Sequence, residues 1–321
     1  MMNNFWRWRW PVPPIFWSLV TSLIIRTISE EAVRFSRPPI PEIFHLKASK
    51  ARQMFSDMKK RERFLGNIIA GFGVVSLLVG PAGLSAGEQQ FVGDHIPTTA
   101  GDLIIHPVEH ATFLMSWAGK TIYVDPVGGK KPFDQFDRAD LVLITDIHGD
   151  HLNPETVNLV TTDKSAIVAP KAVADKLSAK VKSQTTVMAN ADKKEIAGIQ
   201  IEAIPMYNLT PDRLKFHTKG RGNGYVLTIG GKRIYISGDT EDIPEMRQLK
   251  NIDVAFVCMN LPYTMEVEKA ASAVREFKPK IVYPYHYHGS DLQKFKELVS
   301  QTPGIEVRLR EWYPERKGAP K

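Results

Sequence analysis

The sequence contains very little cysteine: Cys258 is the only one among 321 residues. A single thiol excludes an intrachain disulfide framework, although it is compatible with export. Because Cys258 ends the apolar run "VAFVC", we expect it to be a buried packing residue.

The body of the chain also lacks a net charge. The whole chain has a formal net charge of +7, with 42 Lys and Arg against 35 Asp and Glu. Residues 1–63 hold 12 of the basic and 5 of the acidic side chains, so the other residues carry 30 of each sign. A neutral body lacks the basic face that binds a phosphate backbone, and we therefore expect no nucleic-acid partner.

Long apolar runs are scarce and lie near the N-terminus. The stretch 15–25, "IFWSLVTSLII", is shorter than the roughly 20 residues that span a bilayer. The second stretch follows a basic cluster at 59–63, is apolar over 64–80, and ends with small residues at Ala86. That order predicts a secretory signal peptide at 58–86, with an uncleaved membrane anchor as the alternative. We therefore expect a periplasmic or secreted protein.

This signal sets the expected domain boundaries. A signal peptide normally begins at the first residue, so Met58 is the expected natural initiator. Residues 1–57 are then an over-extended start or a genuine extension, disordered or membrane-associated. Residues 87–100 read as a polar linker. Residues 101–321 remain for one mixed α/β domain, a size that suits a single domain.

Short strands dominate the first half of this domain. The segments "ATFLMSW" and "KTIYVD" predict a hairpin, and the apolar run at 140–145 predicts a buried strand. Asn153-Pro154 predicts a helix start. Further strands are expected at 165–169, 199–204, 224–229, 232–237, 252–257 and 280–285, with a helix over 266–277 between the last two.

Metal-capable side chains lie in four loops at the ends of these strands. The stretch "TDIHGDHLN", directly after the buried strand, places two His and two Asp within positions 146–151. Asp239 ends "KRIYISGD", His286 ends "KIVYPYH", and His217 precedes another strand. A single His or Asp at a strand end usually has a structural role. Their joint occurrence instead predicts a metal site, because rigid strand ends can direct imidazoles and carboxylates to one point.

The order of these residues resembles that of the metallo-β-lactamase-fold hydrolases. Their H-x-H-x-D-H motif follows a strand, and a His, a bridging Asp and a final His come downstream. This chain has "DIHGDH", His217, "SGDTE" and "YPYHY" in that order. The resemblance implies an αββα sandwich of two mixed β-sheets with outer helices. "EHATFLMSWAGKTIYVDP" and "GNGYVLTIGGKRIYISGDT" are most similar to the branch with ascorbate-phosphate lactonases and N-acylphosphatidylethanolamine phospholipases.

The resemblance also implies a ligand set for two divalent metal ions. The first ion would bind Asp146, His148 and His217; the second would bind Asp150, His151 and His286; Asp239 would bridge them. His110 in "EHAT" and Asp125 in "YVDP" would support the ligands or line the site.

Asp146 departs from the family pattern, which usually has His there. A third carboxylate shifts the metal preference from Zn²⁺, the first expectation, toward Mn²⁺ or Fe²⁺. The alternative is that Asp146 only forms hydrogen bonds, which would leave the first position weak or empty.

The expected activity follows from the metal site. Two cations about 3.5–4 Å apart hold a hydroxide, lower its pKa and polarise a carbonyl or phosphoryl oxygen. Asp150 or Asp239 would orient the hydroxide and take its proton. We therefore predict an exported hydrolase of an ester, lactone or phosphodiester in a small-molecule or lipid-like substrate. The alternative is a non-catalytic metal-binding protein on the same scaffold, and the oligomeric state stays open.

Four nearby polar side chains are candidates to donate a hydrogen bond to the oxygen that becomes negative during hydrolysis, with packing as their alternative role. They are Tyr207, Asn208, Tyr263 and Tyr285.

Overall fold

The computed structural model describes residues 93–313. The predicted N-terminal extension and the signal peptide or anchor at 58–86 lie outside this range. Within it, no helix is both long and apolar enough to cross a membrane.

The first sheet follows the chain order strand by strand. Strands β1 to β4 are antiparallel to their neighbours, and β4 to β7 are parallel. The strands are β1 (Asp94–Thr98), β2 (Gly101–Glu109), β3 (Thr112–Trp117), β4 (Lys120–Val124), β5 (Leu141–Leu143), β6 (Ala166–Ala169) and β7 (Thr185–Val187).

The second sheet repeats this arrangement. Strands β8 to β11 are antiparallel to their neighbours, and β11 to β14 are parallel. The strands are β8 (Lys193–Ile196), β9 (Ile199–Met206), β10 (Gly222–Ile229), β11 (Lys232–Ile236), β12 (Val254–Cys258), β13 (Ile281–Tyr285) and β14 (Glu306–Val307).

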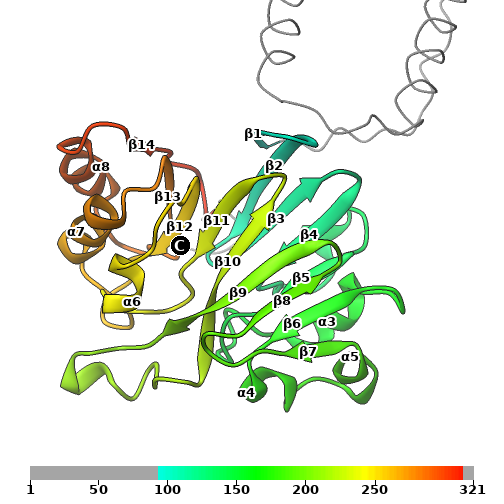
Figure 1. The fold of residues 1–321 in the computed structure, drawn as a ribbon. Coiled ribbons are helices and arrows are strands. Elements are labelled where there is room, and N and C mark those ends of the chain that lie inside the picture. The colour runs from blue at the N-terminus through cyan, green and yellow to red at the C-terminus, as the bar shows by residue number, and fades with distance from the viewer. Residues whose placement is uncertain (1–92, 314–321) are drawn as a thin grey trace, which may run out of the picture. The chain divides into compact units, whose positions relative to one another are not determined.

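Helices cover the outer face of each sheet, with α3, α4 and α5 on one side and α6, α7 and α8 on the other (Figure 1). They are α3 (Pro154–Val160), α4 (Lys171–Ala174), α5 (Ala179–Ser183), α6 (Pro244–Arg247), α7 (Val267–Phe277) and α8 (Leu292–Ser300), with short 3-10 turns η1 (Lys131–Phe133) and η2 (Pro211–Arg213). The predicted αββα sandwich of two mixed sheets is therefore confirmed.

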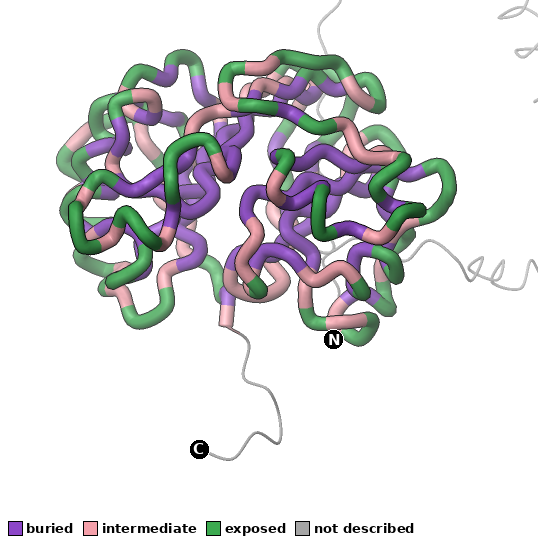
Figure 2. The backbone as a smooth tube through the Cα atoms, turned by 90° about the horizontal axis from the view of Figure 1, so that it is seen from below, coloured by how far each residue is buried: buried purple, intermediate pink, exposed green. Residues whose placement is uncertain are grey.

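The main core lies between the two sheets. Phe113 of β3 stacks on Phe256 of β12 with ring centroids 4.2 Å apart, and both side chains are fully buried. A smaller core packs the other face of the first sheet against α3, α4 and α5. Figure 2 shows the strands mainly as buried and the outer loops as exposed. Cys258 is buried, as expected.

Hydrogen bonds also join the two sheets near the ends of their strands. The amide of Asn223 donates to the carbonyl of Thr145 over 3.0 Å, and the hydroxyl of Tyr225 donates to the carbonyl of Ile144 over 2.9 Å. These bonds fix the start of β10 against the end of β5. The loops that leave the two sheets at this edge are therefore held in a defined relative position.

Most of the predicted elements are present. The hairpin at 111–125, the buried strand, the helix that begins after Asn153, and the helix at 266–277 all form. Asn153 caps α3, because its side-chain oxygen accepts from the amide of Thr156 over 2.9 Å.

The predicted linker at 87–100 is wrong in part, because residues 94–98 form β1. This strand pairs along its whole length with β2 and buries Ile96. Its single inward-facing apolar residue gives a weak sequence signal, which is typical of an edge strand.

Candidate metal centre

Asp239 is the centre of the site. It follows β11 after Gly238, whose φ of +60° is the left-handed conformation that favours glycine. A Cβ on Gly238 would also lie 2.5 Å from the sulfur of Met206. This close turn directs the carboxylate of Asp239 into the space between the sheet ends, where the side chain is buried.

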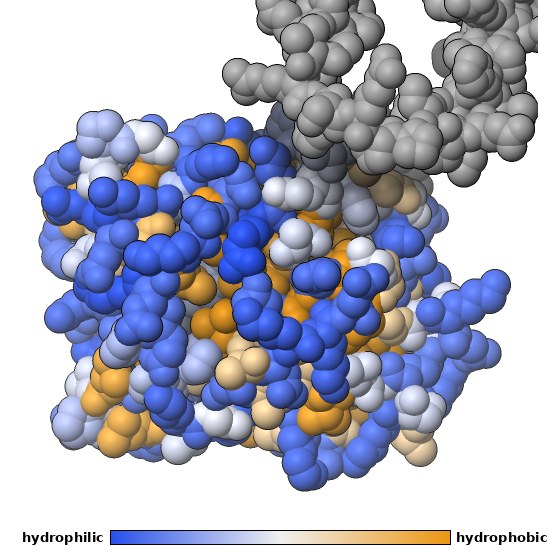
Figure 3. Space-filling model, in the orientation of Figure 1, coloured by the Kyte–Doolittle hydropathy of each residue, from blue (hydrophilic) through white to orange (hydrophobic). Residues whose placement is uncertain are grey.

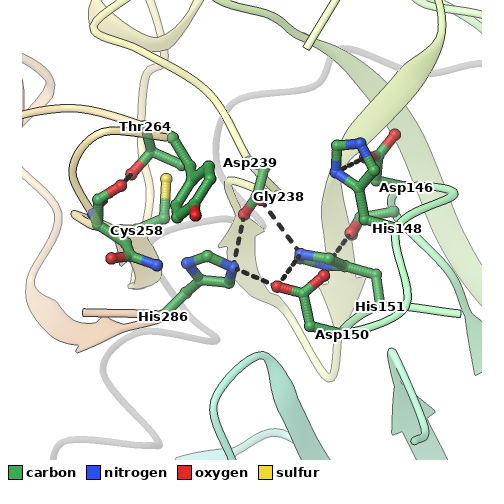
Figure 4. A network of polar contacts seen from close by, with 12 residues as sticks. Asp146, His148, Asp150, His151, Gly238, Asp239, Cys258, Thr264 and His286 are labelled. Carbon is green, nitrogen blue, oxygen red and sulfur yellow. Dashed lines mark hydrogen bonds and ion pairs between the residues drawn. The ribbon is translucent and has the colours of Figure 1, made fainter. Parts of the chain in front are cut away.

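Three imidazole nitrogens converge on this carboxylate. Nε2 of His151 lies 3.2 Å from Oδ2 and Nε2 of His286 lies 3.2 Å from Oδ1 (Figure 4). Nε2 of His217 also lies 3.2 Å from Oδ2. The histidines come from different loops, after β5, before β10 and after β13. They therefore meet only when the two sheets pack.

The converging atoms approach one another without the geometry of hydrogen bonds. Nε2 of His151, Nε2 of His217 and Oδ1 of Asp239 are buried and have no hydrogen-bond partner. Buried polar atoms are normally paired, so such a group needs an explanation. A divalent cation bound among these nitrogens and oxygens would satisfy them, and this donor set fits Zn²⁺ or a similar ion.

Electrostatics favour the same conclusion. Burial opposes ionisation of Asp239, but the imidazoles of His286 and His151 hold its pKa well below the usual value. Burial also opposes a charged His151, whereas the carboxylates of Asp239 and Asp125 raise the pKa of its imidazole. A cation at this position would supply the positive charge that a protonated imidazole of His151 otherwise supplies.

Asp150 lies at the open side of the group. Its Oδ2 is 3.1 Å from Nε2 of His110, 3.3 Å from Nε2 of His286 and 3.9 Å from Nε2 of His151. Its side chain is 44% exposed, unlike that of Asp239. Burial opposes its ionisation, but hydrogen bonds from His110 and His286 hold its pKa far below the usual value. Asp150 is therefore an ionised carboxylate that solvent and substrate can reach.

Asp125 orients His151 from behind. Its Oδ2 lies 2.9 Å from Nδ1 of His151, and its two oxygens also accept from the amide and the hydroxyl of Thr145, each over 2.7 Å. With Nδ1 held in this way, Nε2 points toward Asp239. Metal-binding histidines in proteins typically have such a partner.

His217 has a comparable support, because Oδ1 of Asn208 lies 3.3 Å from its Nδ1. His286 differs, because its Nδ1 is buried without a hydrogen-bond partner. The ring of His110 lies against that of His286 with centroids 3.8 Å apart and a tilt of 40°, and Nδ1 of His110 is 2.6 Å from the hydroxyl of Tyr313. The structure thus places the predicted residues His110, Asp125 and Asn208 directly behind or beside the converging imidazoles.

Three of the eight non-glycine residues with a positive φ in the described part of the chain lie at the site. His110, Asp125 and His286 have φ values of 54°, 46° and 46°. Non-glycine residues in this left-handed conformation cost roughly 1–3 kcal/mol each and cluster at functional sites.

Asp146 and His148 form a second group with His217. Their ligand atoms lie within 4.8 Å of one another. Asp146 is fully buried, and Arg221 donates to both of its oxygens, over 3.2 Å to Oδ1 and 2.9 Å to Oδ2.

Three of the four predicted oxyanion donors are buried and bonded to other groups of the protein. The hydroxyl of Tyr207 donates to Glu245 over 3.0 Å, and that of Tyr285 is buried and accepts from the amide of Gly238 over 3.0 Å. Asn208 uses its amide nitrogen for the carbonyls of Arg213 and Tyr263. Among the four candidates, Tyr263 alone is exposed.

Arg221 and Tyr313 were not predicted from the sequence. Tyr313 comes from a segment with no strand or helix pattern, and nothing in the sequence connects it with His110. Arg221 had an indirect signal, because a buried carboxylate at position 146 requires a compensating positive charge.

Replacing Asp125 with Asn should weaken metal binding by about 10–100-fold, because His151 loses the charged partner that orients it. Competition with a chromophoric chelator measures the affinity. Asp253→Asn is the matched control, since Asp253 is also largely buried but bonds Lys280 at the start of β12 and β13, whereas His286 follows the end of β13. Equal affinities in the two variants would contradict the role given to Asp125.

Comparisons with known proteins are consistent with this geometry. The model of a beta-lactamase superfamily domain matches residues 105–286. A UPF0173 metal-dependent hydrolase of Pyrococcus abyssi (strain GE5 / Orsay) is 31% identical over 222 residues, covering 62% of this chain and 96% of that protein. A UPF0173 metal-dependent hydrolase of Thermococcus onnurineus (strain NA1) is 32% identical over 205 residues, covering 59% and 89%.

Solved structures of other proteins are also similar to this chain. A protein of Parabacteroides distasonis ATCC 8503, assigned to the metal-dependent hydrolases, has 42% identity and a TM-score of 0.64, covering 69% of this chain and 99% of that chain. A metallo hydrolase of Ignicoccus hospitalis KIN4/I, at 23% identity and a TM-score of 0.55, covers 65% and 95% and shares the fold. The predicted similarity to the branch with ascorbate-phosphate lactonases and N-acylphosphatidylethanolamine phospholipases stays a prediction. The chain belongs to the metallo-β-lactamase superfamily of metal-dependent hydrolases.

Proposed function

We propose that this metal-dependent hydrolase cleaves an ester, lactone or phosphodiester bond at the group formed by Asp150, His151, Asp239 and His286. The observation that carries the proposal is the convergence of three imidazole nitrogens on Asp239 without hydrogen-bond geometry. A divalent ion bound there lowers the pKa of a water molecule and polarises a carbonyl or phosphoryl oxygen.

The two aspartates differ in what they can do. Asp239 is buried and surrounded by imidazoles, so its carboxylate holds the group together. Asp150 is ionised, half-exposed and within hydrogen-bond distance of His110 and His286. Asp150 is therefore the group that orients the attacking water and accepts its proton, since a general base must be ionised and reachable.

We further propose that the substrate carries an apolar group. Six large hydrophobic side chains are exposed among the described residues, and four of them are 46–48% exposed on two loops, 207–217 and 260–264. We call these four the apolar rim: Leu209, Leu214, Leu261 and Tyr263. Figure 3 shows apolar side chains at the surface in the lower left, where the loop between β9 and β10 lies in Figure 1.

The apolar rim is rigid and adjoins the metal centre. Asn208 joins its two loops, because its amide nitrogen donates to the carbonyl of Tyr263 over 2.7 Å while its oxygen faces His217. Arg213 adds a bond to the carbonyl of Thr264 over 2.9 Å. Apolar side chains held in place beside a polar reaction centre support binding of an alkyl or acyl group.

Removal of the metal should abolish hydrolysis. We expect chelator-treated protein to lose turnover of at least one of three probes, a p-nitrophenyl ester, an aliphatic lactone and bis(p-nitrophenyl) phosphate, and to regain it with Zn²⁺ or Mn²⁺. His151→Ala should lower the rate by at least about 10–100-fold. His95→Ala is the control, because His95 is exposed and its ring bonds Asp102, outside the metal centre. A metal-loaded protein inactive on all three probes would favour the non-catalytic alternative.

Polar substitutions in the apolar rim should reduce turnover of long-chain substrates selectively. For Leu214→Ser we expect kcat/KM for p-nitrophenyl octanoate to fall about tenfold while that for p-nitrophenyl acetate is retained. Each methylene removed from water contributes about 0.8 kcal/mol, and about 1.4 kcal/mol is tenfold. Leu159→Ser, at a 38% exposed leucine on α3, is the matched control. Equal losses for both esters would contradict the proposed role.

We also propose that the protein is exported to the periplasm or secreted. The order of basic, apolar and small residues at 58–86 supports this proposal. N-terminal sequencing of the exported protein should find a mature chain that begins close to Gly87. A mature chain that retains residues 58–80 would show an anchor instead.

A further inference from the structure

Arg221 holds the carboxylate of Asp146, the residue at which this chain departs from the H-x-H-x-D-H pattern. Nε of Arg221 lies 3.2 Å from Oδ1 and Nη2 lies 2.9 Å from Oδ2, while Asp146 is fully buried. Two parallel bonds from one guanidinium are a strong and directional way to pair a carboxylate. The positive charge that compensates the buried carboxylate of Asp146 therefore comes from a side chain of the protein itself, that of Arg221.

His148 belongs to the same network. Its Nδ1 lies 3.0 Å from Oδ2 of Asp146, and its Nε2 lies 3.4 Å from Nη2 of Arg221. The Nδ1 contact does not have the geometry of a hydrogen bond, and Nη2 of Arg221 also donates to the carbonyl of Phe216 over 2.5 Å. The guanidinium nevertheless lies against both Asp146 and Nε2 of His148.

His217, the third member of this group, faces Asp239. Nε2 of His217 lies 3.2 Å from Oδ2 of Asp239, as Nε2 of His151 does. Nε2 of His217 is among the buried atoms without a hydrogen-bond partner, whereas neither oxygen of Asp146 is. The buried atoms that a cation would satisfy therefore lie around Asp239, not around Asp146.

A second divalent ion would face a fixed positive charge. Asp146 already shares its two oxygens with the guanidinium of Arg221. A second divalent ion would lie beside a guanidinium that cannot lose its proton, and this like-charge contact is unfavourable in a partly buried site.

We propose that the centre binds one divalent ion, among Asp150, His151, His217, Asp239 and His286, and that Arg221 replaces the first ion of the family pattern as a fixed cation. The sequence had predicted two ions. Arg221 is 19% exposed and lies beside His148, so its positive charge can stabilise negative charge that develops on a substrate oxygen. This catalytic consequence rests on the proposed hydrolysis, whereas the metal count does not.

Metal stoichiometry tests the proposal without a substrate. The full chain is saturated with Mn²⁺ or Zn²⁺, desalted and analysed for metal content. We expect one equivalent for the wild-type protein and for Asp146→Asn. Arg221→Gln should bind two, because Asp146 and His148 are then free to act as ligands. Arg213→Gln is the matched control, with a side chain that is also 19% exposed and ion-paired, and it should bind one.

Electron paramagnetic resonance of the Mn²⁺-loaded proteins gives an independent readout. The wild-type protein should show an isolated Mn²⁺ signal, and Arg221→Gln should show two coupled ions that share Asp239. Two equivalents in the wild-type protein would overturn the proposal. One equivalent in a folded Arg221→Gln, judged by circular dichroism, would overturn it as well.

If Arg221→Gln does not fold, the wild-type signal and Arg221→Lys decide the question. Lysine keeps the positive charge, so this variant should bind one equivalent, and two would contradict the proposal. Hydrolysis that survives complete metal removal would instead contradict the proposed function and leave the metal count unaffected.

Discussion

The centre depends on one arrangement, a buried carboxylate surrounded by imidazoles. Taking the charge of Asp239 out of water costs several kcal/mol unless it is compensated. The compensating groups come from both sheets, with His151 following β5 and His286 following β13. Packing of the sheets, seen in the stacking of Phe113 on Phe256, therefore also assembles the metal centre. The strained backbones of His110, Asp125 and His286 are tolerated because these contacts hold them in place.

The candidate ligands came from the family resemblance, and the positions of His151 and Asp239 after strands with a clear apolar pattern supported them. The structure brings these side chains together, because β5 and β11 belong to two sheets that pack on each other. The sandwich was predictable through the family resemblance. Strand β1 and helix α8 were not predicted: β1 has only one inward-facing apolar side chain, and α8 comes after the last predicted strand, in a segment that had been assigned no element.

Other parts of the site could not be predicted, because proximity in sequence says little about side-chain direction. Successive residues in a strand point to opposite faces, so Tyr285 enters the core although its neighbour His286 reaches the metal centre. Arg221 finds its partner 75 positions away in the sequence. Only the requirement that a buried Asp146 be neutralised indicated that such a residue exists, and it did not indicate which one.

Anomalous X-ray diffraction from crystals grown with Zn²⁺ shows directly whether a metal ion binds at Asp239. We expect a peak about 2.0–2.2 Å from Nε2 of His151, Nε2 of His286 and an oxygen of Asp239, the usual range for such ligands. A structure in which these imidazoles hydrogen-bond to Asp239 directly, with no metal peak among them, would contradict this expectation.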